Sequence, residues 1–269
     1  MMLLKRILTA SIIAPIVVFS VLLLTQTGFA LVLALILIIS SWEYCDLIQI
    51  KHLAGKALFT LVILVVTYFL LSAPSNLTMV LYVGAVWWLI ALIWVVMFPK
   101  GSHLLRKNLL VKLINGLFIF VPMAASLMAL HFQDKALVLF LLILIWAADI
   151  GAYFAGKFFG KNKLCPSVSP GKTLEGVYGG IVLAQVVAIT YVYITTQTPL
   201  LIDFLIFSFL ALSVSLVSVL GDLFESVLKR IAEVKDSGNM LPGHGGILDR
   251  IDSLTSSAPI FFLLIVFLL

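Results

Sequence analysis

The chain has 269 residues, of which 63% are hydrophobic and only 11% charged, and its mean hydropathy is +1.23. This composition excludes an ordinary soluble globular domain and indicates an integral membrane protein. The net charge of +5 would suggest nucleic-acid binding if the basic residues formed one solvated block, but they are dispersed between apolar runs, so we expect no nucleic-acid partner.

The apolar runs predict an all-α fold, a polytopic bundle of transmembrane helices in contact with the lipid bilayer. A hydrocarbon core about 30 Å thick needs ~20 apolar residues per helix. Lys5 and Arg6 precede the first run as in a secretory signal, but that run is long and leads into another, so we expect an uncleaved span. Nine spans are expected, near residues 7–25, 29–48, 57–73, 77–98, 113–132, 136–156, 176–196, 200–221 and 255–269.

The Lys and Arg residues predict the orientation of these spans, because short cytoplasmic loops collect such residues. With a cytoplasmic N-terminus, the nine spans place 16 of the 17 Lys and Arg residues on the cytoplasmic side. Only Lys135 falls outside. One missed span would move every later loop to the other side, so the bias favours nine spans.

The first half of the chain offers few chemical candidates. Glu43 and Asp46 lie at the inner end of the second span, where we expect interfacial residues that pair with Lys51 or with solvent. Cys45 and Cys165 match no metal or redox spacing. We therefore divide the chain into N-terminal transmembrane helices, 1–135, and a C-terminal catalytic region, 136–269.

The sixth span carries the first candidate, Asp149. A carboxylate inside an apolar helix is costly unless it faces a bundle interior or a wet cavity, so Asp149 is a functional candidate. Tyr153 and Gly156 share its helix face. For Gly151 and the other small residues of this span, we expect close packing against another helix.

The loop after the sixth span contains Gly171-Lys172-Thr173, which is similar to part of a P-loop. That motif needs a glycine where Pro166 stands, and no strand is expected ahead of it, so we reject a P-loop. A turn that presents Lys172 and Thr173 at the start of the seventh span remains, and helix N-terminal amides with a lysine can hold phosphate. Glu175 either caps this helix or pairs with Lys172.

A polar segment, residues 226–252, follows the eighth span and reads SVLKRIAEVKDSGNMLPGHGGILDRID. Just before it, Asp222 lies at the membrane border, where a carboxylate can bind a metal ion that also contacts substrate phosphate. Gly245 and Gly246 allow backbone amides to approach an anion, and His244 can donate to a phosphate oxygen. Asp249 and Asp252 are three residues apart, so a helix would place both carboxylates on one face, which suits a hard cation. The alternative is a solvated charged loop.

This segment resembles the signature of the phosphatidate cytidylyltransferases, also called CDP-diacylglycerol synthases. It matches the pattern S-x-L-K-R-x4-K-D-x-G-x2-L-P-x-H-G-G-I-x-D-R-I-D without a gap. Three upstream stretches also match: D-x-G-A-Y-x-x-G at 149–156, S-P-x-K-T-x-E-G at 169–176 and G-D-x-x-E-S at 221–226. The first 140 residues resemble the family only in hydropathy.

The resemblance implies an enzyme of phospholipid biosynthesis that transfers the cytidylyl group of CTP to phosphatidate, giving CDP-diacylglycerol and pyrophosphate. It further implies a homodimer in a bacterial-type inner membrane, with the active site on the cytoplasmic side. A phosphomonoester is largely dianionic near neutral pH, so the attacking group needs charge neutralisation rather than a general base.

The expected site combines carboxylates for metal with cations for phosphate. We assign Mg²⁺, with a second cation as an option, to Asp222, Asp249 and Asp252, and add Asp149 as a further candidate. The expected catalytic residues are Asp222, Lys229, Arg230, Asp249 and Asp252. The expected substrate-binding residues are Lys172, Thr173, Lys235, His244, Gly245, Gly246 and Arg250.

Two other classes of membrane protein share features with this sequence. A secondary transporter should show internal repeats and broken helices near mid-membrane, whereas the charges here cluster at one border. A related lipid enzyme with a different nucleotide or alcohol is the stronger rival. The CDP-alcohol phosphotransferases carry an Asp-Gly-x2-Ala-Arg motif, and the sequence lacks it.

Overall fold

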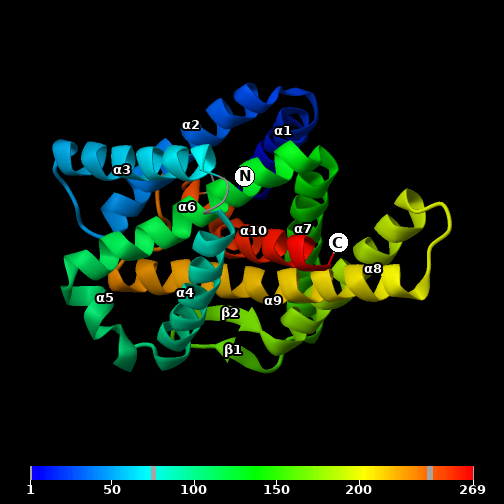
Figure 1. The fold of residues 1–269 in the computed structure, drawn as a ribbon. Helices are drawn as coiled ribbons and strands as arrows, with labels where there is room; N and C mark the ends of the chain where they lie inside the picture. Colours follow the sequence, from blue (N-terminus) through cyan, green and yellow to red (C-terminus); the bar gives the residue numbers. More distant parts are fainter. Residues whose placement is uncertain (1, 74–76, 241–244, 269) are drawn as a thin grey trace.

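The fold is a bundle of long helices with one short hairpin at its border (Figure 1). The computed structural model describes residues 2–73, 77–240 and 245–268, and for residues 2–10 it describes the backbone alone. The elements are α1 (Met2–Leu23), α2 (Gln26–Leu47), α3 (Leu53–Ser72), α4 (Leu77–Met97), η2 (Lys100–Ser102), α5 (His103–Lys107), α6 (Leu109–Gln133), α7 (Lys135–Phe159), β1 (Lys163–Cys165), β2 (Ser169–Thr173), α8 (Leu174–Thr195), α9 (Leu201–Ile231) and α10 (Leu248–Leu268).

The predicted all-α transmembrane fold is confirmed. Within the described residues, eight helices are long and apolar enough to cross a membrane, namely α2 to α4 and α6 to α10. The first predicted span, 7–25, corresponds to α1, whose described side chains form the shorter apolar segment Ser11–Leu23. The chain is therefore a multi-pass membrane protein.

Two helices extend further into the polar segment than the sequence predicted. Helix α9 continues ten residues past the expected end at 221, and α10 begins seven residues before the expected start at 255. Several polar residues in these extensions, such as Glu225, Lys229 and Asp252, are buried or partly buried within the protein, so a criterion of apolar composition does not detect these helical turns. As a result, Lys229, Asp249 and Asp252 all lie on helices.

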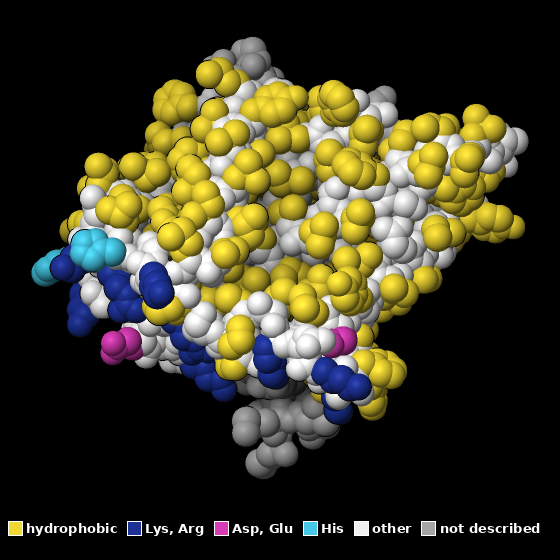
Figure 2. Space-filling view, turned by 90° about the horizontal axis from the view of Figure 1, so that it is seen from below, with side chains coloured by type: hydrophobic (Ala, Val, Ile, Leu, Met, Phe, Trp, Pro, Cys, Tyr) yellow, Lys and Arg dark blue, Asp and Glu magenta, His cyan; other side chains and the backbone are white. Residues whose placement is uncertain are grey.

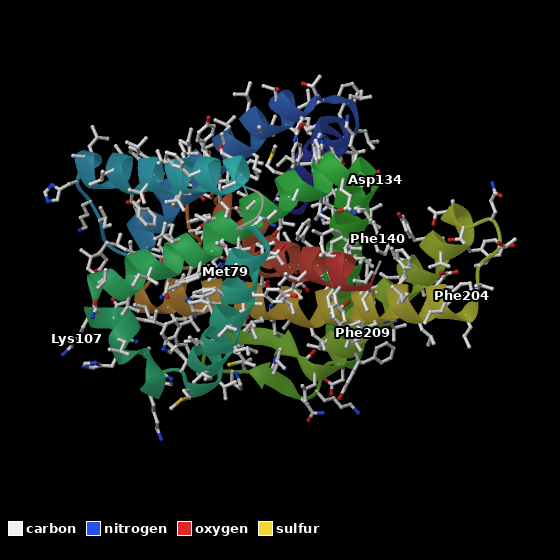
Figure 3. The ribbon with its side chains drawn as sticks, in the orientation of Figure 1. Met79, Lys107, Asp134, Phe140, Phe204 and Phe209 are labelled. Atoms are coloured by element: carbon white, nitrogen blue, oxygen red, sulfur yellow. The ribbon has the colours of Figure 1, made fainter. Side chains whose placement is uncertain are left out.

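Polar residues between the apolar runs define where several helices begin. Thr25, Asn108, Asp134 and Thr173 each accept a hydrogen bond from a backbone amide in the first turn of α2, α6, α7 and α8. Such caps satisfy amide groups that have no partner within the helix. Figure 3 shows Asp134 at the junction of α6 and α7.

Helices α7 and α8 approach each other through small residues, as predicted for this span. A Cβ atom on Gly151 would lie 2.4 Å from the carbonyl oxygen of Gly179. A Cβ atom on Gly180 would lie 2.7 Å from the carbonyl oxygen of Ala148. Larger side chains would force the two backbones apart, and this contact holds the N-terminal part of α8 beside Asp149.

An aromatic cluster joins the four helices of the C-terminal region. Phe140 of α7, labelled in Figure 3, stacks on Tyr191 of α8 with ring centroids 4.1 Å apart. It also contacts Phe207 of α9 and Phe261 of α10. On each helix the cluster lies about two to three turns from the residues that line the cavity described below. The cluster therefore fixes the four helices relative to one another at a distance from the site.

Lys135, the exception to the predicted charge distribution, has a structural role. Its ammonium group donates to the carbonyl oxygens of Leu22 at 3.0 Å and Leu24 at 2.7 Å. A His131 ring nitrogen also hydrogen-bonds the carbonyl oxygen of Val21 at 3.1 Å. Because the last carbonyl groups of a helix lack internal partners, Lys135 satisfies the end of α1.

Candidate functional site

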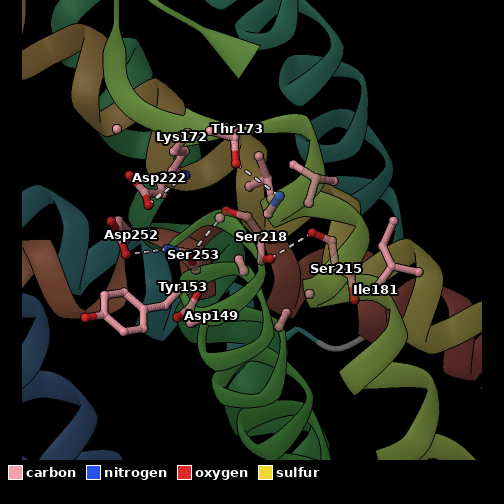
Figure 4. A pocket seen from close by; sticks show the side chains of 18 of the residues that line it. Asp149, Tyr153, Lys172, Thr173, Ile181, Ser215, Ser218, Asp222, Asp252 and Ser253 are labelled. Atoms are coloured by element: carbon pink, nitrogen blue, oxygen red, sulfur yellow. Dashed lines mark hydrogen bonds and ion pairs between the residues drawn. The ribbon is translucent and has the colours of Figure 1, made fainter. Parts of the chain in front are cut away.

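A cavity of about 620 Å³ is formed by α7, β2, α8, α9, α10 and the loop that precedes α10. Every residue that lines it falls between 148 and 253, within the region predicted to be catalytic. Figure 4 shows side chains from several of these segments converging on it. Its polar lining consists of Asp149, Tyr153, Lys157, Lys172, Thr173, Ser215, Ser218, Asp222, Lys229, Asp236, Asp249, Arg250, Asp252 and Ser253.

The β1–β2 hairpin brings Lys172 to Asp222, just before the polar segment. Its ammonium nitrogen lies 2.7 Å from Oδ2 of Asp222 (Figure 4). The next residue, Thr173, also lines the cavity. Its hydroxyl oxygen caps α8 by accepting a 3.1 Å hydrogen bond from the Gly176 amide. Glu175 instead accepts from the amides of Lys161 and Asn162, and so ties the end of α7 to the start of α8.

Asp249 holds the loop that precedes α10. Its Oδ1 atom accepts from the Lys229 ammonium at 2.7 Å. Its Oδ2 atom accepts from the amide and the hydroxyl of Ser237, each at 2.9 Å, and from the Gly246 amide at 2.8 Å. This arrangement fits a residue that shapes the polar segment, and the predicted metal role of Asp249 stays a prediction.

The basic residues of the polar segment point in different directions. Lys229 lines the cavity and lies between Glu225 and Asp249, 2.7 Å from an oxygen of each. Arg230 instead donates to the carbonyl oxygen of Val168 at 3.0 Å, and Lys235 is exposed in the loop after α9. Neither Arg230 nor Lys235 lines the cavity, contrary to prediction. Successive helical residues point about 100° apart, so of Lys229 and Arg230 only one faces inward.

Asp149, Asp222 and Asp252 are the carboxylates best placed to hold a cation. All three carboxylates line the cavity. Among the described residues no group of three or more His, Cys, Asp or Glu side chains could hold a metal by itself. Mg²⁺, however, commonly binds through one or two carboxylates together with waters and substrate phosphates. The oxygen donors of Asp222 and Asp252 therefore fit a Mg²⁺ ion that the substrate helps to bind.

The remaining predicted substrate-binding residues are Arg250, His244, Gly245 and Gly246. Arg250 lines the cavity, whereas His244 lies outside the described residues. Gly245 has a φ of +80°, a backbone conformation that glycine adopts without strain. The Gly246 amide donates to Asp249, so Gly246 has a structural role and does not line the cavity.

Several cavity residues were missed by the sequence reasoning. The hydroxyl groups of Ser215 and Ser218 donate to carbonyl oxygens of their own helix, α9. They nevertheless line the cavity with Asp222. Ser218 and Asp222 follow Ser215 by three and seven residues, a spacing that places all three side chains on one helix face. This spacing could have predicted that the two serines lie beside Asp222.

Comparisons with known proteins reveal similarity over nearly the whole chain. The model of the cytidylyltransferase family matches residues 4–268. A phosphatidate cytidylyltransferase of Haemophilus influenzae is 38% identical over 281 residues, covering 97% of both chains. Proteins of the same name from Pseudomonas aeruginosa and Thermotoga maritima are 39% and 34% identical, covering 97% and 96% of this chain and 96% and 94% of their own. The similarity thus includes the N-terminal half, where the sequence alone indicated only shared hydropathy.

Proposed function

Because the chain belongs to the cytidylyltransferase family, we propose that it transfers the cytidylyl group of CTP to phosphatidate, giving CDP-diacylglycerol and pyrophosphate. The observation that carries this proposal is the convergence of four separate sequence motifs on one cavity. The cavity has polar walls for phosphates and, at Val177, Ile181 and Val219, apolar walls that suit a lipid.

The reaction is an in-line displacement at phosphorus. A phosphate oxygen of phosphatidate attacks the α-phosphorus of CTP. The bond from this phosphorus to the oxygen that bridges the β-phosphorus breaks, and pyrophosphate leaves with the bonding electrons. Both substrates are anionic, so the site has to neutralise charge and align the reacting atoms.

Lys172 and Arg250 are the cavity cations that we assign to the phosphates. Lys229 is already held between two carboxylates, so we assign it to positioning Asp249. We propose that Asp222 and Asp252, with Asp149 nearby, hold Mg²⁺. When bound, this ion would neutralise charge on the triphosphate. A second cation and a homodimer, both expected from the sequence analysis, stay predictions.

The purified protein tests this function directly. We expect pyrophosphate release to require CTP, phosphatidate and Mg²⁺ together, with CDP-diacylglycerol as the lipid product. Equal activity with another nucleotide would support the rival lipid enzyme with different substrate specificity. No pyrophosphate with any nucleotide would contradict the proposal.

For orientation, we propose that the cavity and the N-terminus face the cytoplasm. Lys and Arg side chains gather in a band along one border of the face in Figure 2, while hydrophobic side chains cover most of the rest. This separation supports a membrane-water border there, and positive residues collect on the cytoplasmic side.

Cysteine labelling measures this orientation. In a background with both native cysteines replaced by serine, Gln197→Cys should react with an impermeant maleimide added to intact cells. Lys161→Cys and Lys235→Cys should react only after permeabilisation, because Lys161 lies at the opposite end of α8 and Lys235 near the cavity. Labelling of Lys235→Cys in intact cells would reverse the orientation.

A further inference from the structure

Glu43 of α2 contacts the polar segment although the two are far apart in sequence. It is only 8% exposed. Its Oε1 atom accepts from the Ile247 amide at 3.1 Å, and its Oε2 atom accepts from the Leu248 amide at 2.8 Å. These amides begin α10, and the first amides of a helix lack partners within it. Glu43 is therefore a buried helix cap supplied by the N-terminal region, and not an interfacial residue that pairs with Lys51 or with solvent, as the sequence predicted.

Two glycines of the polar segment lie against this carboxylate. A Cβ atom on Gly238 would lie 2.4 Å from Oε1 of Glu43, and one on Gly246 would lie 2.5 Å from Oε2. Both distances are too short for a real contact, so the missing side chains make room for Glu43. Asp249 binds the neighbouring Ser237 and the Gly246 amide. Glu43 and Asp249 together hold the chain on both sides of residues 241–244.

We propose that Glu43 is a positioning residue for the cytidylyl transfer, acting through the start of α10. It does not line the cavity, whereas Asp252, four residues after Leu248, does. Fixing the first amides of α10 fixes the rotation of that helix, and hence the direction of the Asp252 carboxylate. A negative charge at a helix N-terminus also interacts favourably with the helix dipole. This inference rests on the proposed function and adds a residue outside the cavity to it.

The test compares Glu43→Gln with Asp46→Asn. Gln keeps the size of the side chain but offers an NH₂ group to one of two amide donors, so one hydrogen bond is lost. We expect kcat to fall about 10-fold to 100-fold, the range for hydrogen bonds to a charged group, and the Mg²⁺ concentration for half activity to rise. Asp46 lies on the same helix and pairs with Lys56 away from the cavity, so Asp46→Asn should retain wild-type values.

A merely structural role for Glu43 predicts a different outcome. Activity would then fall only in proportion to the folded protein recovered, with unchanged Mg²⁺ dependence in the folded fraction, and that result would overturn the proposal. If Glu43→Gln does not fold, Gly238→Ala supplies the second test, since its methyl group would press on Oε1 without removing the charge. The same rise in Mg²⁺ requirement is expected, and wild-type kcat and Mg²⁺ dependence in folded Gly238→Ala would contradict the proposal.

Hydrogen exchange separates this inference from the proposed function. We expect peptides that contain Ile247 and Leu248 to exchange faster in Glu43→Gln, while peptides from the middle of α9 stay unchanged. This readout needs no turnover. If the wild-type protein released no pyrophosphate from CTP, the proposed function would be wrong, but hydrogen exchange would still test the helix cap. Unchanged exchange at Ile247 and Leu248 in Glu43→Gln would contradict the role of Glu43 as a cap.

Discussion

Asp252→Asn should lower turnover by at least ~100-fold, the scale of losing one well-placed electrostatic group. Asn keeps almost the same shape and can still accept from the Ser253 amide, which donates to Oδ1 of Asp252 at 2.7 Å. The variant therefore isolates charge from packing. One oxygen ligand for Mg²⁺ loses its charge, so the Mg²⁺ concentration for half activity should also rise.

Asp249→Asn provides the comparison for this prediction. Its side chain binds Lys229, Ser237 and Gly246, so replacing one oxygen by an NH₂ group breaks contacts within the polar segment. We expect lower turnover together with faster hydrogen exchange around residues 237–240. Asp252→Asn should leave that exchange unchanged. Wild-type turnover and metal dependence in Asp252→Asn would remove it from the metal site and leave Asp222 and Asp149 as the candidates.

Lys172→Ala should reduce kcat/KM for CTP by about 100-fold without loss of folded protein. The change removes a cation that would contact phosphate through strong charge-assisted hydrogen bonds. It also leaves Asp222 without its 2.7 Å partner, in a cavity that already contains Asp149 and Asp252. The excess negative charge should repel an anionic substrate. Steady-state kinetics with varied CTP at saturating phosphatidate measures the effect.

Lys163→Ala is the matched control for Lys172. Lys163 lies on β1, next to β2 in the same antiparallel hairpin, but it is exposed and does not line the cavity. Its removal should leave kcat/KM close to the wild-type value. If Lys172→Ala behaved like this control, Lys172 would serve only as a charge that sets the topology.

Much of the fold and part of the site could be predicted from the sequence. Apolar runs located the spans because lipid contact imposes length and composition on a helix. Asp149 was predicted to face the bundle interior or a wet cavity because a carboxylate in contact with lipid has a high free-energy cost. The orientation of other site residues could not be predicted. Whether Lys229 or Arg230 faces inward depends on the rotation of α9. That Asp249 binds the loop depends on Lys229, Ser237 and Gly246, which lie 20, 12 and 3 residues before it in the sequence.

Glu43 shows most clearly what a local pattern cannot reveal. It is a single carboxylate at the end of an apolar helix, and its position alone favours an interfacial residue. The amides that it binds belong to residues 247 and 248, and no spacing rule connects them to residue 43. Only the packing of α2 beside the start of α10 brings these groups together.

A structure of the purified protein with CTP and Mg²⁺ would test the central claim most directly, that this one cavity is where cytidylyl transfer occurs. Phosphatidate is withheld, so CTP cannot react with its acceptor. We predict the triphosphate inside the cavity, with Lys172 on a phosphate oxygen and the metal between the phosphates and the carboxylates of Asp222 and Asp252. A nucleotide bound outside the cavity, with the Lys172–Asp222 ion pair intact, would contradict the account.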